Sequence, residues 1–297
     1  MDDDAVLLEV KGGVAVVTLN RPDHHNAMGD AVDALFFRYL DLLRTDRDVR
    51  VVVWRGNGPS FSVGRDMAEL TDGQDHDGDP ESGPEANGAE PHRADPVGGR
   101  RRDVRIPRRH EFGASDFELL DRTQWGTRLL YDFPVPIICA LKGWTLGTPF
   151  ERALLCDIRV AGEGTKMALP AVDHGVIPDS AGVARLFEIG GAALALDLAL
   201  TGRRIDAAEA LHLGLVSHVV PDDDVDDVAL DLARSIAERP PLVVRLVREH
   251  VQALAAPGVR GTLGRELVGQ TMVLASHDFA EQRSARAQDR EPRYERR

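Results

Sequence analysis

The sequence has 297 residues, of which 43% are hydrophobic, and a formal net charge of −13 at pH 7. A chain of this length can bury a sizeable core, as one large domain or one domain with an appendage. The acidic charge argues against nucleic acid as a main partner, because phosphate backbones are bound by basic faces. No apolar run reaches membrane-spanning length, and the acidic start is unlike a signal peptide. We therefore expect a cytoplasmic protein without membrane contact.

The first expected elements are a hairpin, a helix and a strand. Val6–Val10 and Val14–Leu19 flank a Gly-Gly pair, which is typical of a β-hairpin. Apolar residues at 3.6 spacing then predict a helix over about 31–44, and the short apolar run Val51–Trp54 predicts a strand. The polar loop between hairpin and helix contains Asp23-His24-His25. Three adjacent loop residues cannot all point at one ion, so no metal site is assigned.

Residues 71–113 differ in composition from the rest. Residues 71–95 are rich in Asp, Glu, Gly and Pro, so they bury too little to offset their ordering entropy, and 98–110 are basic. We expect a mobile surface insert whose two halves screen each other. The alternative is that its arginines bind the phosphates of a ligand, because guanidinium groups bind phosphate bidentately.

Further helices are expected after the insert. They cover about 116–133, 194–200 and 207–213, and 171–189 is expected to be a loop followed by a helix with Ser180 as its cap. The remaining chain is expected to be helical over 225–238, 242–254 and 260–277. The two cysteines, Cys139 and Cys156, stand in apolar surroundings, which favours buried free thiols over a disulfide.

The most informative stretch is Pro136–Asp157. Ile137–Leu141 predicts a buried strand, two glycines punctuate the turn, and Phe150–Leu155 has the apolar spacing of a helix. Amides at a helix start lack intrahelical partners and can donate to an oxyanion. Glu151 stands among apolar residues just inside this helix, where desolvation would raise its pKa and suit proton transfer. The alternative is an ordinary connection with a surface Glu.

A second strand, glycine turn and helix start is expected where Phe61–Leu70 follows Val51–Trp54. It provides another set of free amides. Two such turns can converge on one carbonyl oxygen, which a site that stabilises an enolate requires.

With these motifs the sequence resembles the crotonase superfamily, the enoyl-CoA hydratase/isomerase family. The matching segments occur in the family's order and span nearly the whole chain apart from the insert. They are Leu19–Pro22 with Asn26–Met28, Phe61–Leu70, Pro136–Asp157, Gly175–Pro178, and Leu200–Ile205 with Ala207–Val219.

The resemblance implies an α/β fold, a superhelix of ββα repeats followed by a C-terminal helical region. It divides the chain into a crotonase-like core domain over 1–220, with the insert at about 71–113, and a helical region over 221–297 that serves oligomerisation. A homotrimer or a dimer of trimers is implied. The ligand would be an acyl-CoA thioester; CoA is part of the substrate and no separate cofactor is expected.

The resemblance also implies an oxyanion hole made by the amides of Arg65 and Thr148. Val63, Gly64, Asp66 and Gly147 would contact the substrate. Any non-proline residue supplies an N–H, so both donors are retained. The family's triple glycine is Gly147-Thr148-Pro149 here. The side chain at 148 narrows the approach to the ligand, and the proline removes one amide and stiffens the turn.

The family's two catalytic carboxylates are matched only in part. Glu151 matches the first, but the second falls on Ala171, which has no acid–base chemistry. Asp179 matches a position where some dienoyl-CoA isomerases and a dehalogenase keep a functional Asp; the alternative is a turn or helix-cap residue. Asp173 and His174 lie closer to the vacant position in sequence, and we interpret the His as structural.

We therefore expect an enzyme that acts on an acyl-CoA thioester through a stabilised enolate. Glu151, alone or with Asp179, would carry the proton, and double-bond isomerisation is favoured over syn-hydration because hydration uses two carboxylates in the family. The alternatives are a non-catalytic acyl-CoA binder and a lyase or hydrolase on a specialised CoA ester. The sequence does not name the acyl group.

Overall fold

A computed structural model describes residues 4–66 and 114–294. The expected insert at 71–113 lies outside these residues. The strands are β1 Val6–Lys11, β2 Val14–Leu19, β3 Val51–Gly56, β4 Ile137–Leu141, β5 Trp144–Leu146, β6 Ile158–Gly162, β7 Lys166–Ala168, β8 Ile205–Asp206 and β9 His218–Val220. The helices are α1 Asp30–Leu43, α3 Ala114–Tyr131, α4 Thr148–Leu155, α5 Gly182–Thr201, α6 Ala207–His212, α7 Val225–Ala237, α8 Pro241–Leu274 and α9 His277–Ala287, with short 3-10 turns at Pro22–His24, Pro170–His174 and Asp222–Asp224.

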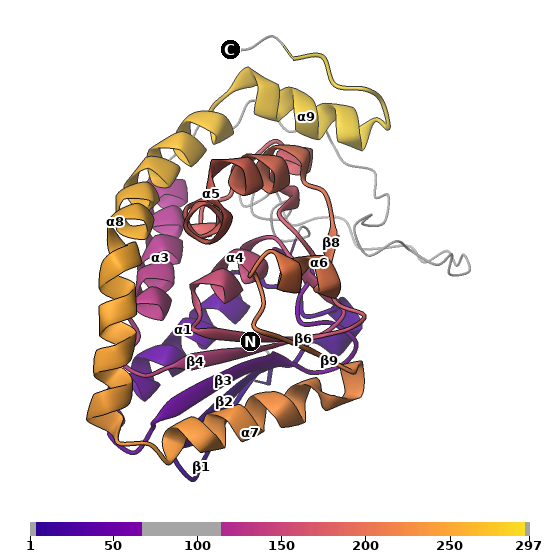
Figure 1. Ribbon diagram of the computed structural model, residues 1–297. Helices are drawn as coiled ribbons and strands as arrows, with labels where there is room; N and C mark the ends of the chain where they lie inside the picture. The colour runs from indigo at the N-terminus through magenta and orange to yellow at the C-terminus, as the bar shows by residue number, and fades with distance from the viewer. Residues whose placement is uncertain (1–3, 67–113, 295–297) are drawn as a thin grey trace, which may run out of the picture.

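The larger of two sheets has the strand order β1-β2-β3-β4-β6-β9. The hairpin β1–β2 is antiparallel, and every later pair is parallel. A smaller sheet joins β5, β7 and β8. This mixed α/β arrangement agrees with the expected fold class, and its outline can be followed in Figure 1.

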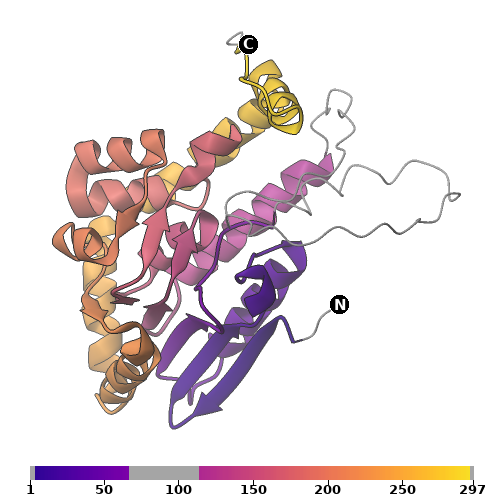
Figure 2. The ribbon, with the colours of Figure 1, turned by 90° about the vertical axis from the view of Figure 1, so that its right-hand side faces the viewer.

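The central strands are apolar on both faces because both faces of the sheet are covered. In β3, Val52 and Trp54 belong to the main core, whereas Val51 and Val53 pack with α7. This alternation follows from the two-residue period of a strand. Figures 1 and 2 show α7 lying along one face of the sheet, opposite α1 and α4. The free cysteines Cys139 and Cys156 are both buried, as predicted.

Helix α8 differs from the prediction of two helices over 242–254 and 260–277. It runs without interruption from Pro241 to Leu274 and packs along α3 and α5. Figure 1 shows it spanning one side of the molecule. A proline inside a helix destabilises the helix by about 3 kcal/mol. The packing of α8 along two neighbouring helices offsets this local penalty.

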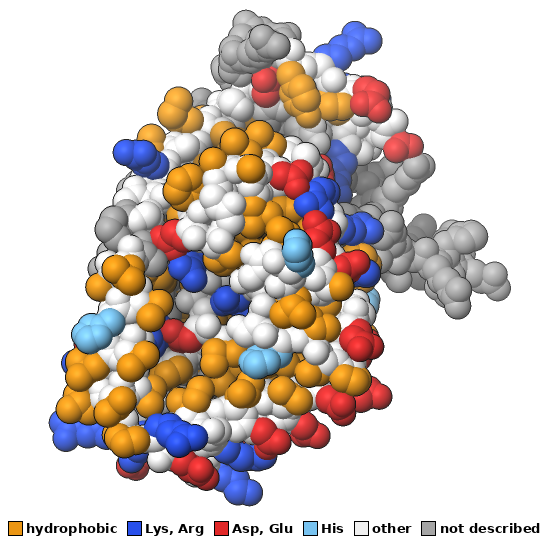
Figure 3. All heavy atoms as spheres, viewed as in Figure 1, with side chains coloured by type: hydrophobic (Ala, Val, Ile, Leu, Met, Phe, Trp, Pro, Cys, Tyr) orange, Lys and Arg blue, Asp and Glu red, His pale blue; other side chains and the backbone are white. Residues whose placement is uncertain are grey.

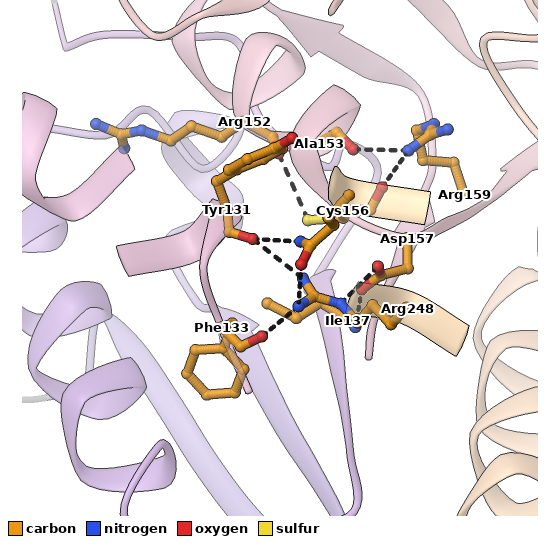
Figure 4. Close-up of polar contacts among 10 residues, drawn as sticks. Tyr131, Phe133, Ile137, Arg152, Ala153, Cys156, Asp157, Arg159 and Arg248 are labelled. Atoms are coloured by element: carbon orange, nitrogen blue, oxygen red, sulfur yellow. Dashed lines mark hydrogen bonds and ion pairs between the residues drawn. The ribbon is translucent and has the colours of Figure 1, made fainter. Parts of the chain in front are cut away.

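Side chains near its N-terminal end fix α8 to the strand that leads into the site (Figure 4). Arg248 donates to Asp157 at 2.7 Å and to the carbonyls of Tyr131 and Phe133. The other oxygen of Asp157 accepts from the amide of Ile137, the first residue of β4, at 2.8 Å. The position of α8 is therefore tied to that of β4 and of the turn that follows it.

None of the described helices is long and apolar enough to cross a membrane.

Candidate functional site

Two turns lie at the carboxyl ends of the neighbouring parallel strands β3 and β4. This is where α/β sheets with parallel strands bind ligands. Beyond these ends the chain pairs again, because Ser62 donates its amide to Trp144 O at 2.9 Å and accepts from Leu146 N at 3.0 Å. Gly64 and Gly147 follow directly on this pairing and face each other. The two turns predicted from sequence are thus brought side by side.

The close approach of the turns requires glycine at both positions. Gly64 has φ +100° and Gly147 has φ +61°, a region that L residues with side chains rarely adopt. A Cβ on Gly64 would lie 3.2 Å from the carbonyl oxygen of Leu146, and one on Gly147 would lie 3.7 Å from Gly64 Cα. Glycine at these positions therefore allows the two turn conformations and the close approach of Gly64 to Leu146.

The N-terminal loop holds the first turn in place. Arg21 donates to Asp66 at 3.0 Å and to the carbonyl of Ala27 at 2.8 Å. Val63 donates its amide to His25 O at 3.1 Å. His25 also contacts the hydroxyl of Ser60, so the loop that contains His25 supports the turn. Asp66 and Val63 therefore both contact this loop, which supports the turn.

The amides of Arg65 and Thr148 lie in these two turns. The bridge between Arg65 and Met28 uses Gly64 O and Asp66 N, so it leaves the Arg65 amide unused. Thr148 is the first residue of α4, where an N–H has no intrahelical partner. Together with Met28 and Asp33, both residues line a pocket of about 10 Å³, the order of volume that one water-sized oxygen occupies.

Pro149 fits the start of α4 without disturbing it. The first turn of a helix leaves its amides unpaired, so a proline there removes no hydrogen bond and its fixed φ suits the helix. The departure from three glycines therefore stiffens the turn and leaves the Thr148 amide in position.

Glu151 is buried one turn inside α4, with 2% of its surface exposed. Its Oε2 accepts from the amides of Ser180 and Gly182, each at 3.1 Å. Burial raises the pKa of Glu151 well above its usual value, the charges of Asp179 and Glu266 raise it further, and the two amides oppose the shift. This is the environment of an acid–base group and excludes the alternative of a surface Glu.

The expected cap at Ser180 is wrong. Helix α5 begins at Gly182, its cap position is Ala181, and no side chain makes a cap bond there. The reason is that carboxylates from other helices take these amides. Asp179 precedes this turn and is partly buried. Burial raises the pKa of Asp179, and the charges of Arg152 and Arg65 oppose the shift. The charge of Asp179 in turn raises the pKa of Glu151.

The segment around Ala171 supplies no carboxyl to Glu151. Asp173 and His174 lie against α9, where Gln282 donates to Asp173 O at 3.0 Å and Arg286 contacts the imidazole. Burial and the charge of Arg286 lower the pKa of His174. The structural interpretation of His174 therefore fits its position.

Sequence reasoning missed two further sets of charged residues. Arg152, fully buried, donates to both oxygens of Asp33 at 2.7 and 2.9 Å and lies over the ring of Phe37. Glu266, 6% exposed on α8, accepts from the amide of Ala181 at 3.0 Å. The only signal was an ionisable residue among apolar ones, which does not reveal partners far away in sequence.

The described residues contain no cluster of three His, Cys, Asp or Glu side chains that could hold a metal ion. Arg65 and Thr148, one from each turn, line one small pocket, and the buried carboxyl of Glu151 lies one turn further along α4.

The fold and the site agree with the family that the sequence resembles, and comparison with known proteins identifies the same family. The family model described as enoyl-CoA hydratase/isomerase matches residues 9–87 and 111–297. The chain belongs to the enoyl-CoA hydratase/isomerase family, the crotonase superfamily, which acts on CoA esters.

Particular relatives have specific names. The chain is 30% identical to a 2,3-dehydroadipyl-CoA hydratase of Escherichia coli over 279 residues, 94% of each chain. It is 28% identical to a carnitinyl-CoA dehydratase of Salmonella enteritidis over 294 residues, 97% of each. The crystal structure of an enoyl-CoA hydratase/isomerase from Xanthobacter autotrophicus superposes with a TM-score of 0.76 at 25% identity, covering 95% of this chain and 93% of that one.

Proposed function

We propose that this protein holds the carbonyl oxygen of an acyl-CoA thioester on the amides of Arg65 and Thr148, and that Glu151 moves a proton on the neighbouring carbon. The observation that carries this proposal is that Arg65 and Thr148 line one pocket of about 10 Å³, with Glu151 buried one turn further along α4 and its pKa raised. Val63, Gly64, Asp66 and Gly147 would shape the wall against which the thioester lies.

For a 3-enoyl thioester, one acid–base group is enough to complete double-bond isomerisation. Glu151 in its carboxylate form takes the proton from C2, and the electron pair moves onto the carbonyl oxygen as a dienolate. The carboxyl then returns the proton to C4, which shifts the double bond. Each amide donor to such an oxyanion contributes about 2.7–4 kcal/mol in comparable sites. Isomerisation suits this chain because Ala171 leaves the usual second carboxylate position without an acid.

Hydration is the second candidate, and the position of Asp179 favours it. Asp179 is a partly buried acid whose charge reaches Glu151, so it is a candidate to hold the water that Ala171 cannot. The names of the hydratase and dehydratase relatives are in line with this chemistry.

Replacing Glu151 by Gln tests the proposal, since the amide keeps the shape and loses the proton transfer. We expect kcat to fall by about 10²–10⁴-fold while the Kd for an unreactive acyl-CoA changes little. Asp41→Asn on the exposed face of α1 is a matched loss of a carboxyl and should leave kcat unchanged. An unchanged kcat in Glu151→Gln contradicts the assignment.

We also propose that copies of this chain associate through α8. The N-terminal half of this helix exposes a row of large apolar side chains, visible in Figure 3; they are Leu242, Val243, Leu246, Val247, Val251 and Leu254. Exposed apolar patches of this kind mark interfaces, and the family resemblance implies a homotrimer. Light scattering should give a trimer or hexamer for the wild type and a smaller species for Val247→Glu.

A further inference from the structure

Three consecutive amides at the start of α5 bind two carboxylates that come from different helices. Ser180 and Gly182 donate to Glu151 on α4, whereas Ala181 between them donates to Glu266 on α8 at 3.0 Å. Ala181 has φ 63° and ψ 12°, a left-handed conformation that is uncommon for a residue with a side chain. The turn therefore adopts a costly backbone conformation in which its amides are divided between the two acids.

Glu266 has the properties of a functional carboxyl. It is 6% exposed, and its Oε1 is buried without a hydrogen-bond partner among the described residues. Burial raises the pKa of Glu266 to about 7, with the Ala181 amide opposing and the charge of Asp179 adding to the shift. A buried polar atom left without a partner costs free energy, so packing alone does not account for a carboxyl here.

The neighbouring charges leave this carboxyl without a cation. On α4, Arg152 pairs with Asp33 of α1, and Arg65, after β3, pairs with Asp30. In the described part of the chain, the three acids Glu151, Asp179 and Glu266 form no ion pair. On the α3 side, α8 meets the neutral Gln124, whose amide donates to Leu263 O. Like charges so close cannot all be ionised at low cost.

We propose that Glu266 is a positioning residue of the site, which fixes the α5 turn around Glu151 and sets the protonation of Glu151 through its charge. The catalytic meaning of this role rests on the function proposed above. In this chain a carboxyl from α8 thus lies next to the turn that donates to Glu151. It acts through Glu151 and the turn and has no assigned contact with the substrate.

Glu266→Gln tests this role because the amide oxygen can still accept from Ala181 while the charge is lost. Infrared spectra of the resting protein report protonated carboxyls directly, and the Glu151 band is identified by its loss in Glu151→Gln. We expect the Glu151 titration midpoint to fall by about one pH unit in Glu266→Gln, because a nearby like charge raises a carboxyl pKa. The low-pH limb of the kcat/KM profile should shift by the same amount.

Gln270, one turn further along α8, offers a matched control. Its Oε1 accepts from the amide of Ile177 at 3.1 Å, so it also ties α8 to the segment before α5, but it carries no charge. Gln270→Met should leave the Glu151 midpoint in place. Glu266→Asp, which keeps the charge, should largely retain the wild-type midpoint and serves if the Gln variant folds poorly.

The proposal is overturned if the Glu151 midpoint in Glu266→Gln equals that of the wild type, or if Gln270→Met shifts it as much. The infrared titration needs no substrate. A shifted midpoint in a protein that turns over no thioester would therefore support this inference while refuting the proposed function.

Discussion

Gly182→Ala perturbs the position of Glu151 without changing its chemistry. A Cβ added to Gly182 would lie 2.4 Å from Glu151 Cγ and 2.8 Å from its Oε2. Restoring an ordinary contact of 3.4 Å requires a shift of about 1 Å, and Glu151 is too tightly buried to move freely. Gly182 has no left-handed backbone angle, so alanine is conformationally acceptable there.

A displacement of about 1 Å at a reacting group can cost about 10²-fold in rate. We expect kcat to fall by this factor in Gly182→Ala, and overpacking should lower the free energy of unfolding by about 1–3 kcal/mol. The assay is the steady-state turnover of the best enoyl-CoA substrate, with urea unfolding of the same samples. The Kd for an unreactive acyl-CoA should change little, since the turns at Gly64 and Gly147 are untouched.

Gly261→Ala is the matched control. It lies in α8 with open space where the Cβ would be placed. This variant should keep full turnover and gain about 0.5–1 kcal/mol from better helix propensity. If Gly182→Ala keeps its kcat within a factor of two, the proton is not transferred from the Glu151 position, and the reasoning fails.

Two predictions concern the charges around the site. Asp33→Asn leaves Arg152 buried without its charge partner and should destabilise the fold by about 3–5 kcal/mol, whereas Asp41→Asn, an exposed partner on the same helix, should cost under about 1 kcal/mol in urea unfolding. The second prediction concerns Glu266, whose pKa rises from 4.5 to about 7 in the folded state. Between pH 4.5 and about 7 the folded state keeps a proton on Glu266 that the unfolded state releases. The stability that this proton contributes is complete below pH 4.5 and is lost as the pH rises through 7. The free energy of unfolding of Glu266→Gln should therefore rise relative to that of the wild type across this window, by up to about 3 kcal/mol. An equal difference in unfolding free energy at pH 5 and pH 8 would contradict the assignment.

The strands and turns that build the candidate site could be predicted because each carries a local signal. Ile137–Leu141 is a short apolar run and forms β4, and the glycines at 64 and 147 mark the turns. Neighbouring parallel strands end at one edge of a sheet, so two turns that follow such strands meet. The convergence of these turns therefore follows from patterns that the sequence displays directly.

The residues that surround Glu151 could not be predicted, because their partners are distant in sequence. Glu266 and Ala181 are 85 residues apart, and Arg152 and Asp33 are 119 apart. The Ser180 cap was mispredicted for the same reason, since the α5 amides are taken by carboxylates from α4 and α8. The continuity of α8 likewise depends on packing against α3 and α5 and has no local signal.

The most direct test of the account is mass spectrometry of 2-enoyl-, 3-enoyl- and dienoyl-CoA thioesters incubated with the protein in D2O. We expect at least one thioester to gain deuterium, at C4 with a shifted double bond or at C2 with added water, and we expect Glu151→Gln to slow this gain at least about 10²-fold. Deuterium gain at an equal rate in Glu151→Gln, or no gain in any thioester, would contradict it.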